Sequence, residues 1–187
     1  MRAWHSIKSG GVDLGSCKTQ DNRDMGTIKT NQTTSAELGN RLFFRLFQCA
    51  NMMHKTGTRA VEEHGATTQQ WAVLGALSRE TANSGMTVGE LAEFLLVSRQ
   101  NLTGVLSRLE KHGYTERTRD SVDGRSRRIQ LTPEGRALWE KRLLPEIFEY
   151  YEDVLQGLSD DDQASILHLL GKLLDNLKAF DEKTSSR

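Results

Sequence analysis

The sequence predicts a mainly α-helical protein with a small β-hairpin wing, that is, a winged helix-turn-helix joined to a helical dimerisation region. Three observations predict this fold class: helical apolar spacing over most of the chain, adjoining capped helices near its middle, and an alternating segment directly after them that turns at an Asp-Gly pair. With 187 residues, 36% of them hydrophobic and 27% charged, the chain is long enough to bury a core.

The N-terminal segment, residues 1–34, is rich in Gly, Ser, Thr, Asn and Lys without a sustained period, which predicts a mobile leader. It carries no secretory signal pattern, and no apolar run in the chain approaches the roughly 18 residues of a membrane span. Two cysteines, Cys17 and Cys49, make no disulfide framework, so we expect a cytoplasmic protein. Met25 is an alternative natural start, which leaves open whether residues 1–24 belong to the natural protein.

From Ser35 onward the chain has the pattern of a long helix with two adjacent apolar stripes. The first stripe is formed by Leu38, Leu42, Leu46, Cys49 and Met53, and the second by Phe43, Phe47, Ala50, His54, Gly57 and Val61. A helix that is apolar over so wide an arc has to be covered on two sides. We therefore expect it to pack partly in its own fold and partly against a second subunit.

Three shorter helices follow, each with a capping signal. The predicted caps are Thr67 or Thr68, Thr87 with Glu90 as its capping-box partner, and Ser98. The inward-facing residues are Trp71, Leu74 and Leu77 in the first, Val88, Leu91, Ala92 and Leu95 in the second, and Leu102, Val105, Leu106 and Leu109 in the third. We expect Asn-Ser-Gly at 83–85 to end the first of these helices and Gly113 to end the third.

The periodicity then changes from helical to alternating, with Asp123-Gly124 as the turn of a hairpin. Thr132 caps and Pro133 begins a long helix to about Gln156, and we expect a bend at Pro145 because proline lacks a backbone donor. Ser159 caps a last helix. Its apolar face is formed by Ile166, Leu170, Leu173, Leu174 and Leu177.

The net charge of zero conceals a strong asymmetry along the chain. Eight Lys or Arg face four acidic residues between Ser98 and Arg128, whereas ten acidic residues face four basic ones between Pro145 and Arg187. This distribution indicates one region that meets a polyanion and another that avoids it.

The helix from Ser98 and the hairpin after it carry the candidate DNA contacts, because short polar and cationic side chains suit base edges and phosphates. On the helix these are Ser98, Arg99, Gln100, Asn101, Thr103, Ser107, Arg108 and Lys111, and on the wing Arg125, Arg127 and Arg128. Arg125 at the wing tip is placed for a minor groove, and Asp123 is expected to orient an arginine. The alternative for any single arginine is a solvated surface cation.

The stretch "LTGVLSRLEKHGYTERTRDSVDGRSRRIQLTPEGRAL", Leu102 to Leu138, resembles the MarR family of bacterial transcriptional regulators. The family's wing pattern is present as Asp123, Arg125 and Arg128, and its helix-start pattern as Leu131, Thr132 and Gly135. The likeness extends from about Leu38 to Phe180. It implies a homodimer on a palindromic double-stranded operator, usually a repressor that a small ligand releases. The expected division is a winged helix-turn-helix DNA-binding domain over 65–144 and a helical dimerisation region over 35–64 and 145–180.

A ligand pocket of the kind the resemblance implies would lie between the dimerisation helices and the DNA-binding part. Phe44, His54 and Trp71 are candidate lining residues for a flat aromatic ligand, and Arg45, like Arg41, is a candidate partner for its carboxylate. The alternative is that His54 and Trp71 are ordinary core or interface residues and that both arginines face solvent or an interface. We expect the effector to be an aromatic acid or its thioester.

Other functional classes find less support. A cysteine that senses peroxides early in the first helix of some family members is replaced here by Phe43, and Cys49 falls on an apolar stripe, so redox sensing is a minor alternative. The histidines lack metal-ligand spacing, no catalytic motif is present, and we expect no cofactor and no enzyme activity. A winged helix that binds only protein would leave the cations of the helix and wing unexplained. The effector, the operator and its genes, and the sign of regulation stay open.

Overall fold

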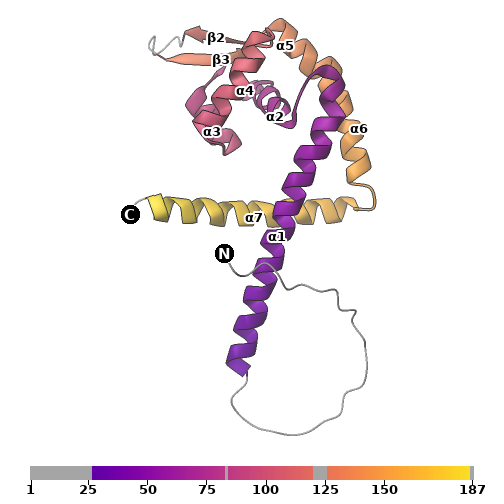
Figure 1. Cartoon of the computed structure of the whole chain (residues 1–187), viewed down its shortest axis with the longest axis vertical. Helices are drawn as coiled ribbons and strands as arrows, with labels where there is room; N and C mark the ends of the chain where they lie inside the picture. Colours follow the sequence, from indigo (N-terminus) through magenta and orange to yellow (C-terminus); the bar gives the residue numbers. More distant parts are fainter. Residues whose placement is uncertain (1–26, 83, 120–125, 186–187) are drawn as a thin grey trace. The chain divides into compact units, whose positions relative to one another are not determined.

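The long N-terminal helix, α1, spans Thr27–Val61 (Figure 1). The computed structural model describes residues 27–82, 84–119 and 126–185, with side chains from Ser35 onward. The helix begins eight residues before the predicted start at Ser35, so the C-terminal part of the expected leader is helical. No Gly or Pro interrupts residues 27–34, so the polar run is free to extend the helix. The rest of the expected leader lies outside the described residues.

The chain divides into two compact units, 1–47 and 48–187, with the boundary inside α1. In the first unit the described part is the N-terminal portion of α1. Its large apolar side chains other than the half-buried Leu46 are exposed, from 46% for Phe44 to 66% for Leu38. The predicted two-sided apolar surface is therefore present in the first unit, whereas Gly57 and Val61 at its far end are buried in the core of the second unit.

The second unit contains three capped helices in the predicted places. They are α2 (Thr68–Leu77), α3 (Val88–Leu95) and α4 (Arg99–Lys111). Thr67 and Thr87 each form a complete capping box, with Gln70 and Glu90 respectively, and the Ser98 hydroxyl accepts the N–H of Asn101. Gly113, at φ +74°, follows α4 as predicted.

One predicted helix end was wrong. The helix α2 ends at Leu77, and a 3₁₀ turn, η2 (Glu80–Ala82), follows before the 83–85 segment that was expected to end it. The Ser78 hydroxyl donates to the carbonyl of Gly75 at 2.9 Å, so a side chain replaces the continuing helical ladder there.

The wing belongs to a three-stranded antiparallel sheet rather than an isolated hairpin. Its strands are β1 (Met86–Thr87), β2 (Thr115–Arg119) and β3 (Arg127–Leu131), in the order β1-β3-β2. The predicted hairpin is confirmed as the β2–β3 pair, whereas its Asp123-Gly124 turn lies outside the described residues. The strand β1 was missed because two residues carry no alternating pattern.

The predicted helix from Pro133 is interrupted near Pro145. It consists of α5 (Pro133–Leu138), a π-helical turn η3 (Trp139–Leu143) and α6 (Leu144–Val154). The N–H of Leu144 bonds to the carbonyl of Trp139, five residues back. This wider turn directly precedes Pro145, which supplies no N–H of its own.

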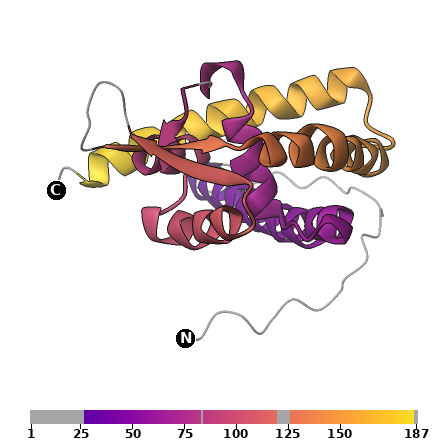
Figure 2. The ribbon, with the colours of Figure 1, turned by 90° about the horizontal axis from the view of Figure 1, so that it is seen from above.

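The last helix, α7 (Asp160–Ser185), runs straight in both ribbon views (Figures 1 and 2). Ser159 caps it as predicted, because its hydroxyl accepts the N–H of Asp162 and its own N–H donates to the Asp162 carboxylate. That hydroxyl also bonds to the carboxylate, and these bonds lower the pKa of Asp162. No side chain of α7 is buried, and none of the described helices is long and apolar enough to cross a membrane.

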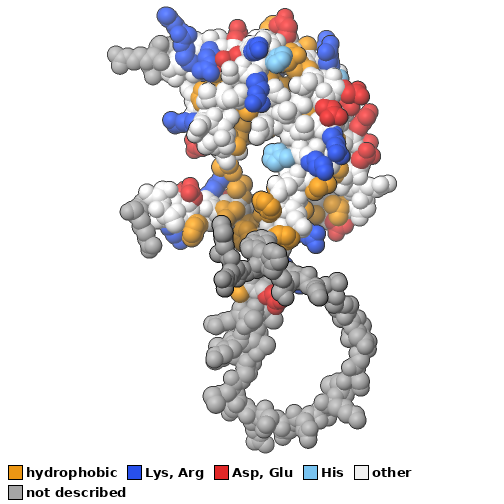
Figure 3. Space-filling model, viewed as in Figure 1, with side chains coloured by type: hydrophobic (Ala, Val, Ile, Leu, Met, Phe, Trp, Pro, Cys, Tyr) orange, Lys and Arg blue, Asp and Glu red, His pale blue; other side chains and the backbone are white. Residues whose placement is uncertain are grey.

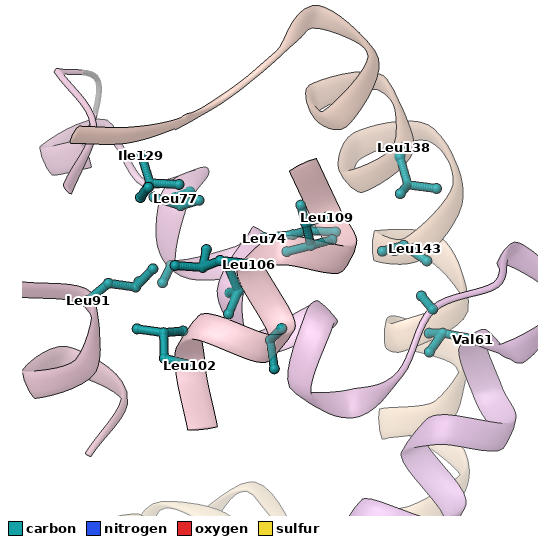
Figure 4. Close-up of a cluster of buried hydrophobic side chains, with 14 of the residues drawn as sticks. Val61, Leu74, Leu77, Leu91, Leu102, Leu106, Leu109, Ile129, Leu138 and Leu143 are labelled. Atoms are coloured by element: carbon teal, nitrogen blue, oxygen red, sulfur yellow. The ribbon is translucent and has the colours of Figure 1, made fainter. Parts of the chain in front are cut away.

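The hydrophobic core lies within the second unit, between α2, α3, α4, β3 and the helices from α5 to α6 (Figure 4). Its large, nearly solvent-free side chains include Leu74, Leu91, Leu102, Leu106, Leu109, Ile129, Leu143 and Ile147. All four predicted inward residues of α4 are buried. The core therefore fixes α4 and β3 to the same scaffold.

Candidate nucleic-acid interface

The exposed side of α4 is polar along its whole length. Because a helix turns about 100° per residue, the side opposite the buried leucines can be read from the sequence. Its centre carries Gln100, Gly104, Ser107 and Lys111, with Asn101, Thr103 and Arg108 toward its edges, and all of them are exposed. The acidic residue of the helix, Glu110, accepts a 2.6 Å hydrogen bond from Arg117 Nε. This side of α4 therefore presents hydrogen-bond donors and cations to solvent, and the one carboxylate of the helix, that of Glu110, is already paired with Arg117.

Three of the predicted contact residues also have structural roles. Ser98 caps the helix, and the Thr103 hydroxyl donates to the carbonyl of Arg99 at 2.8 Å. The Arg99 guanidinium lies against α3, where a Cβ placed on Gly89 would be 3.1 Å from its Nη2. Arg99 therefore sits at the α3 side of α4, away from the centre of the exposed face.

Two wing arginines lie directly opposite each other. Arg119 of β2 pairs in register with Arg127 of β3, and both side chains are exposed. In the space-filling view, cationic side chains project from the end of the molecule that carries these strands (Figure 3). Facing like charges cost stability in a strand pair. Arg125 and Asp123, the predicted tip contact and its orienting partner, lie outside the described residues.

Arg128 points into the protein rather than outward. Its Nη2 donates to the carbonyl of Gly85 at 2.8 Å and to the Glu90 carboxylate at 3.2 Å, and its Nε donates to the carbonyls of Ser84 and Gly85. The side chain is 22% exposed. It joins β3 to the start of α3. The sequence predicts Arg128 as a DNA contact, and periodicity alone does not show that its guanidinium also bonds to Gly85 and Glu90.

The helix-start pattern after the wing fixes the hairpin against α4. The Thr132 hydroxyl donates to the carbonyl of Gly113 at 2.6 Å and accepts the N–H of Gly135 at 3.0 Å. A Cβ on Gly135 would collide with the carbonyl oxygen of Tyr114. Only glycine allows this close approach, so the pattern Leu131, Thr132, Gly135 sets the position of the wing strands relative to the end of α4.

A second candidate region is a cluster of aromatic side chains around Trp71. Its ring centroid lies 6.1 Å from that of Tyr150, edge to face, and 5.8 Å from that of Tyr151. The Tyr150 hydroxyl is 2.9 Å from that of Thr56, and burial, followed by the Tyr150 charge, raises the pKa of Tyr151. Sequence reasoning missed both tyrosines, although two adjacent aromatics on a predicted amphipathic helix were a usable signal.

The other predicted ligand residues are more exposed than Trp71. The His54 side chain is exposed, and its backbone carbonyl accepts the Thr68 hydroxyl at 2.9 Å. Phe44 and Arg45 belong to the first unit and are exposed there. Cys49, which falls on the first predicted apolar stripe, is exposed and forms no disulfide among the described residues. Among the residues that the structure describes, no cluster of acidic, His or Cys side chains has the form of a metal site.

Comparison with known proteins identifies similar sequences and folds. A family model described as "MarR family" matches residues 64–126. The transcriptional activatory protein BadR of Rhodopseudomonas palustris is 57% identical over 146 residues, 78% of this chain and 83% of that protein. The homoprotocatechuate degradative operon repressor of Escherichia coli is 31% identical over 114 residues, 61% of this chain and 74% of that protein. The solved structure of the transcriptional repressor CouR, bound to a 23-mer DNA duplex, aligns with a TM-score of 0.64 and 29% identity over 74% of this chain and 95% of that one.

Proposed function

The chain belongs to the MarR family of transcriptional regulators, and from this premise we propose that it binds operator DNA as a homodimer and responds to a small aromatic acid or its thioester. In this proposal residues 65–144 form the DNA-binding domain. The helices of 35–64 and 145–180 form the dimerisation region. Relatives named as DNA-bound or operon regulators support the proposal.

The observation that carries the proposal is the exposed side of α4 beside the facing arginines of the wing. Gln100, Asn101 and Ser107 have the donors and acceptors that major-groove base edges require. Arg108 and Lys111 lie on the same side and suit phosphates. The repulsion between Arg119 and Arg127 has no compensation among the described side chains, and a nearby phosphate backbone would relieve it.

We give Arg128 a positioning role within the same proposal. Its bonds to Gly85 and Glu90 hold β3 against the start of α3. Arg127, the preceding residue of the strand, then faces outward. Arg125 and Asp123 remain the proposed minor-groove contact and its orienting carboxylate.

The test uses the full chain and a duplex selected from a random-sequence pool by repeated rounds of binding. We expect a palindromic consensus and an affinity that falls steeply as salt rises. Asn101→Ala should relax selection at particular bases and leave the salt slope unchanged, because it removes a base contact and no charge. Recovery of no consensus, with equally weak binding to every duplex, would favour a winged helix that binds protein alone.

Whether the protein represses or activates transcription is a separate part of the proposal. The resemblance implied a repressor, whereas BadR is named an activator and the Escherichia coli relative a repressor. We propose repression relieved by ligand. A reporter fused to the selected operator should then be silenced by the protein, and stimulation of that reporter would assign the opposite sign.

The aromatic cluster supports the ligand class. Trp71, Tyr150 and Tyr151 present ring faces and edges suited to stacking on a flat ring, and the paired hydroxyls of Thr56 and Tyr150 offer polar contacts. The name of one relative places it in the control of an aromatic degradation operon.

The effector is tested by thermal shift across a panel of aromatic acids and their thioesters. For an active compound, Trp71→Phe should weaken release from the operator and leave operator affinity without ligand nearly unchanged. Tyr150→Phe, which keeps the ring and removes the hydroxyl, separates stacking from hydrogen bonding. A Trp71→Phe protein that is several kcal/mol less stable but responds normally would show that Trp71 is only a packing residue.

A further inference from the structure

The hairpin of β2 and β3 turns one face toward the core and extends past it. Arg117 of β2 is in register with Ile129 of β3, and the Ile129 side chain is fully buried. Side chains directly opposite each other lie on the same face of a sheet, so Arg117 shares the core-facing side. The next pair along that face is Arg119 and Arg127, and both are exposed. Among the described residues of the hairpin, none beyond the pair of Arg117 and Ile129 is buried.

An ion pair joins β2 to α4 at this position. Arg117 Nε donates to Glu110 Oε1 at 2.6 Å, across the junction between the wing and the helix. On the other face of the sheet, Arg128 donates to the carbonyl of Gly85 and to the Glu90 carboxylate. The strand β2 is thus attached to α4 by Arg117, and β3 to the start of α3 by Arg128.

The ion pair places a carboxylate beside a surface that is otherwise suited to DNA. Glu110 directly precedes Lys111, which lies at the centre of the exposed side of α4. A negative charge there opposes the approach of a phosphate backbone. The side chains of Arg117 and Glu110 are 39% and 28% exposed, and an ion pair so exposed contributes little to the stability of a fold. Neither attraction to DNA nor folding stability therefore explains this carboxylate, whereas its contact with the wing does.

We propose that Glu110 is a positioning residue, and that its ion pair with Arg117 fixes the angle of the wing to α4. Arg119 and Arg127 then stand at a set distance from the side of the helix that carries the proposed base contacts. Glu110 acts through Arg117 and makes no contact with DNA. The consequence for binding rests on the proposed function, but the angle itself is a property of the free protein.

The first test compares the full chain with Glu110→Gln on the selected operator duplex. Loss of the ion pair should weaken binding at least five-fold and make the slope of log affinity against log salt shallower, because wing and helix no longer reach their phosphates together. A carboxylate that acted only by its charge would give the opposite result, since its removal would tighten binding and steepen the slope. Unchanged or tighter binding by Glu110→Gln would overturn the proposal.

The matched control is Glu116→Gln, which removes the same charge from β2 itself. Its carboxylate accepts a 2.8 Å hydrogen bond from Gln130 Nε2 within the hairpin and has no role in the junction with α4. This variant should bind the duplex at least as tightly as the parent. Weakening equal to that of Glu110→Gln would mean that the effect does not come from the contact with Arg117.

A second measurement needs no DNA. Amide residual dipolar couplings of the free protein report the orientation of β2 and β3 relative to α2, α3 and α4. The strands should change orientation in Glu110→Gln and in Arg117→Gln, and keep the parent orientation in Glu116→Gln. Circular dichroism melting checks that each variant folds as the parent does. Strands that keep the parent orientation in Glu110→Gln would overturn the proposal, whereas a parent protein that selects no duplex would overturn only the proposed function.

Discussion

Arg127 and Arg128 are neighbours in the sequence but differ in what surrounds them. The Arg127 side chain is exposed opposite Arg119, whereas Arg128 bonds to two backbone carbonyls and the Glu90 carboxylate. Alternation along a strand sends consecutive side chains to opposite faces. The same residue type therefore serves the surface at one position and the fold at the next.

These two arginines make a matched pair of variants. Arg128→Ala should lower the free energy of unfolding by about 1–3 kcal/mol, because it leaves carbonyls without their charged donor. Arg127→Ala should leave the free energy of unfolding unchanged or slightly higher, because it removes the repulsion from Arg119, and should make the slope of log DNA affinity against log salt shallower by about one. Chemical denaturation and salt-dependent binding measure the two effects. Equal stability of both variants would show that the Arg128 bonds contribute nothing to the fold.

Thr115 differs from Arg128, because its buried hydroxyl has no hydrogen-bond partner among the described residues. Its side chain is 3% exposed, and its hydroxyl has no hydrogen-bond partner in the described structure. Thr115→Val keeps the branched shape and removes this group, so we expect the free energy of unfolding to rise by about 1 kcal/mol. Thr118→Val on the same strand, where the side chain is half-buried, is the control. Destabilisation by Thr115→Val would mean that the hydroxyl bonds to a water molecule.

At the scale of the element, α4 contains a glycine that packing does not require. A Cβ on Gly104 would have no heavy atom within 4 Å, and the residue lies mid-helix at the centre of the exposed side. Gly104→Ala should therefore stabilise the free protein by about 1 kcal/mol. It should also weaken binding to the selected operator, because the added methyl group keeps the helix from approaching the duplex closely. Stability and affinity that rise together would show that DNA stays clear of this position.

The helix starts were predictable from the sequence because capping is local chemistry. Thr87 and Glu90 bond to each other's backbone N–H groups within four residues, and Ser98 and Ser159 act over a similar span. The buried face of α4 was also predictable from local sequence, because the helical spacing of its apolar residues decides which side faces the core.

What the sequence did not show depends on distant partners. The strand β1 exists only because β3 pairs with it, and the inward turn of Arg128 depends on Gly85, 43 residues earlier. The contact of Trp71 with Tyr150 and Tyr151 joins two helices far apart in the chain. Such contacts follow from tertiary packing, which periodicity does not encode.

At the scale of the whole molecule, a large apolar surface is uncovered in the single chain. In α7 the exposed fractions are 44% for Ile166 and Leu170 and 42% for Leu177, and the first unit exposes its own apolar stripes. Some of these apolar side chains appear on the face shown in Figure 3. Surfaces of this kind mark an interface.

We therefore predict a mass in solution of twice the 21.0 kDa chain by sedimentation analysis. Leu170→Asp, at the centre of the α7 stripe, should shift the protein toward monomer and reduce affinity for a palindromic duplex, because each subunit contributes one half-site. Ser165→Asp adds the same charge on the opposite side of α7 and should leave the dimer intact. A monomer at micromolar concentration in the parent protein would remove the basis for a palindromic operator.

The short pairing of Met86 with Ile129 also governs the order in which this domain can open and close. It closes a loop of about 40 residues that contains α3 and α4, and closing such a loop has an entropic cost that the local hydrogen bonds of either helix do not have. The helices can therefore form early, while the sheet forms only when both ends of the loop meet. Once closed, β3 cannot detach without releasing β1 and the start of α3. In native-state hydrogen exchange, the amides of β3 should then open with the same free energy as those of α3, as one cooperative unit.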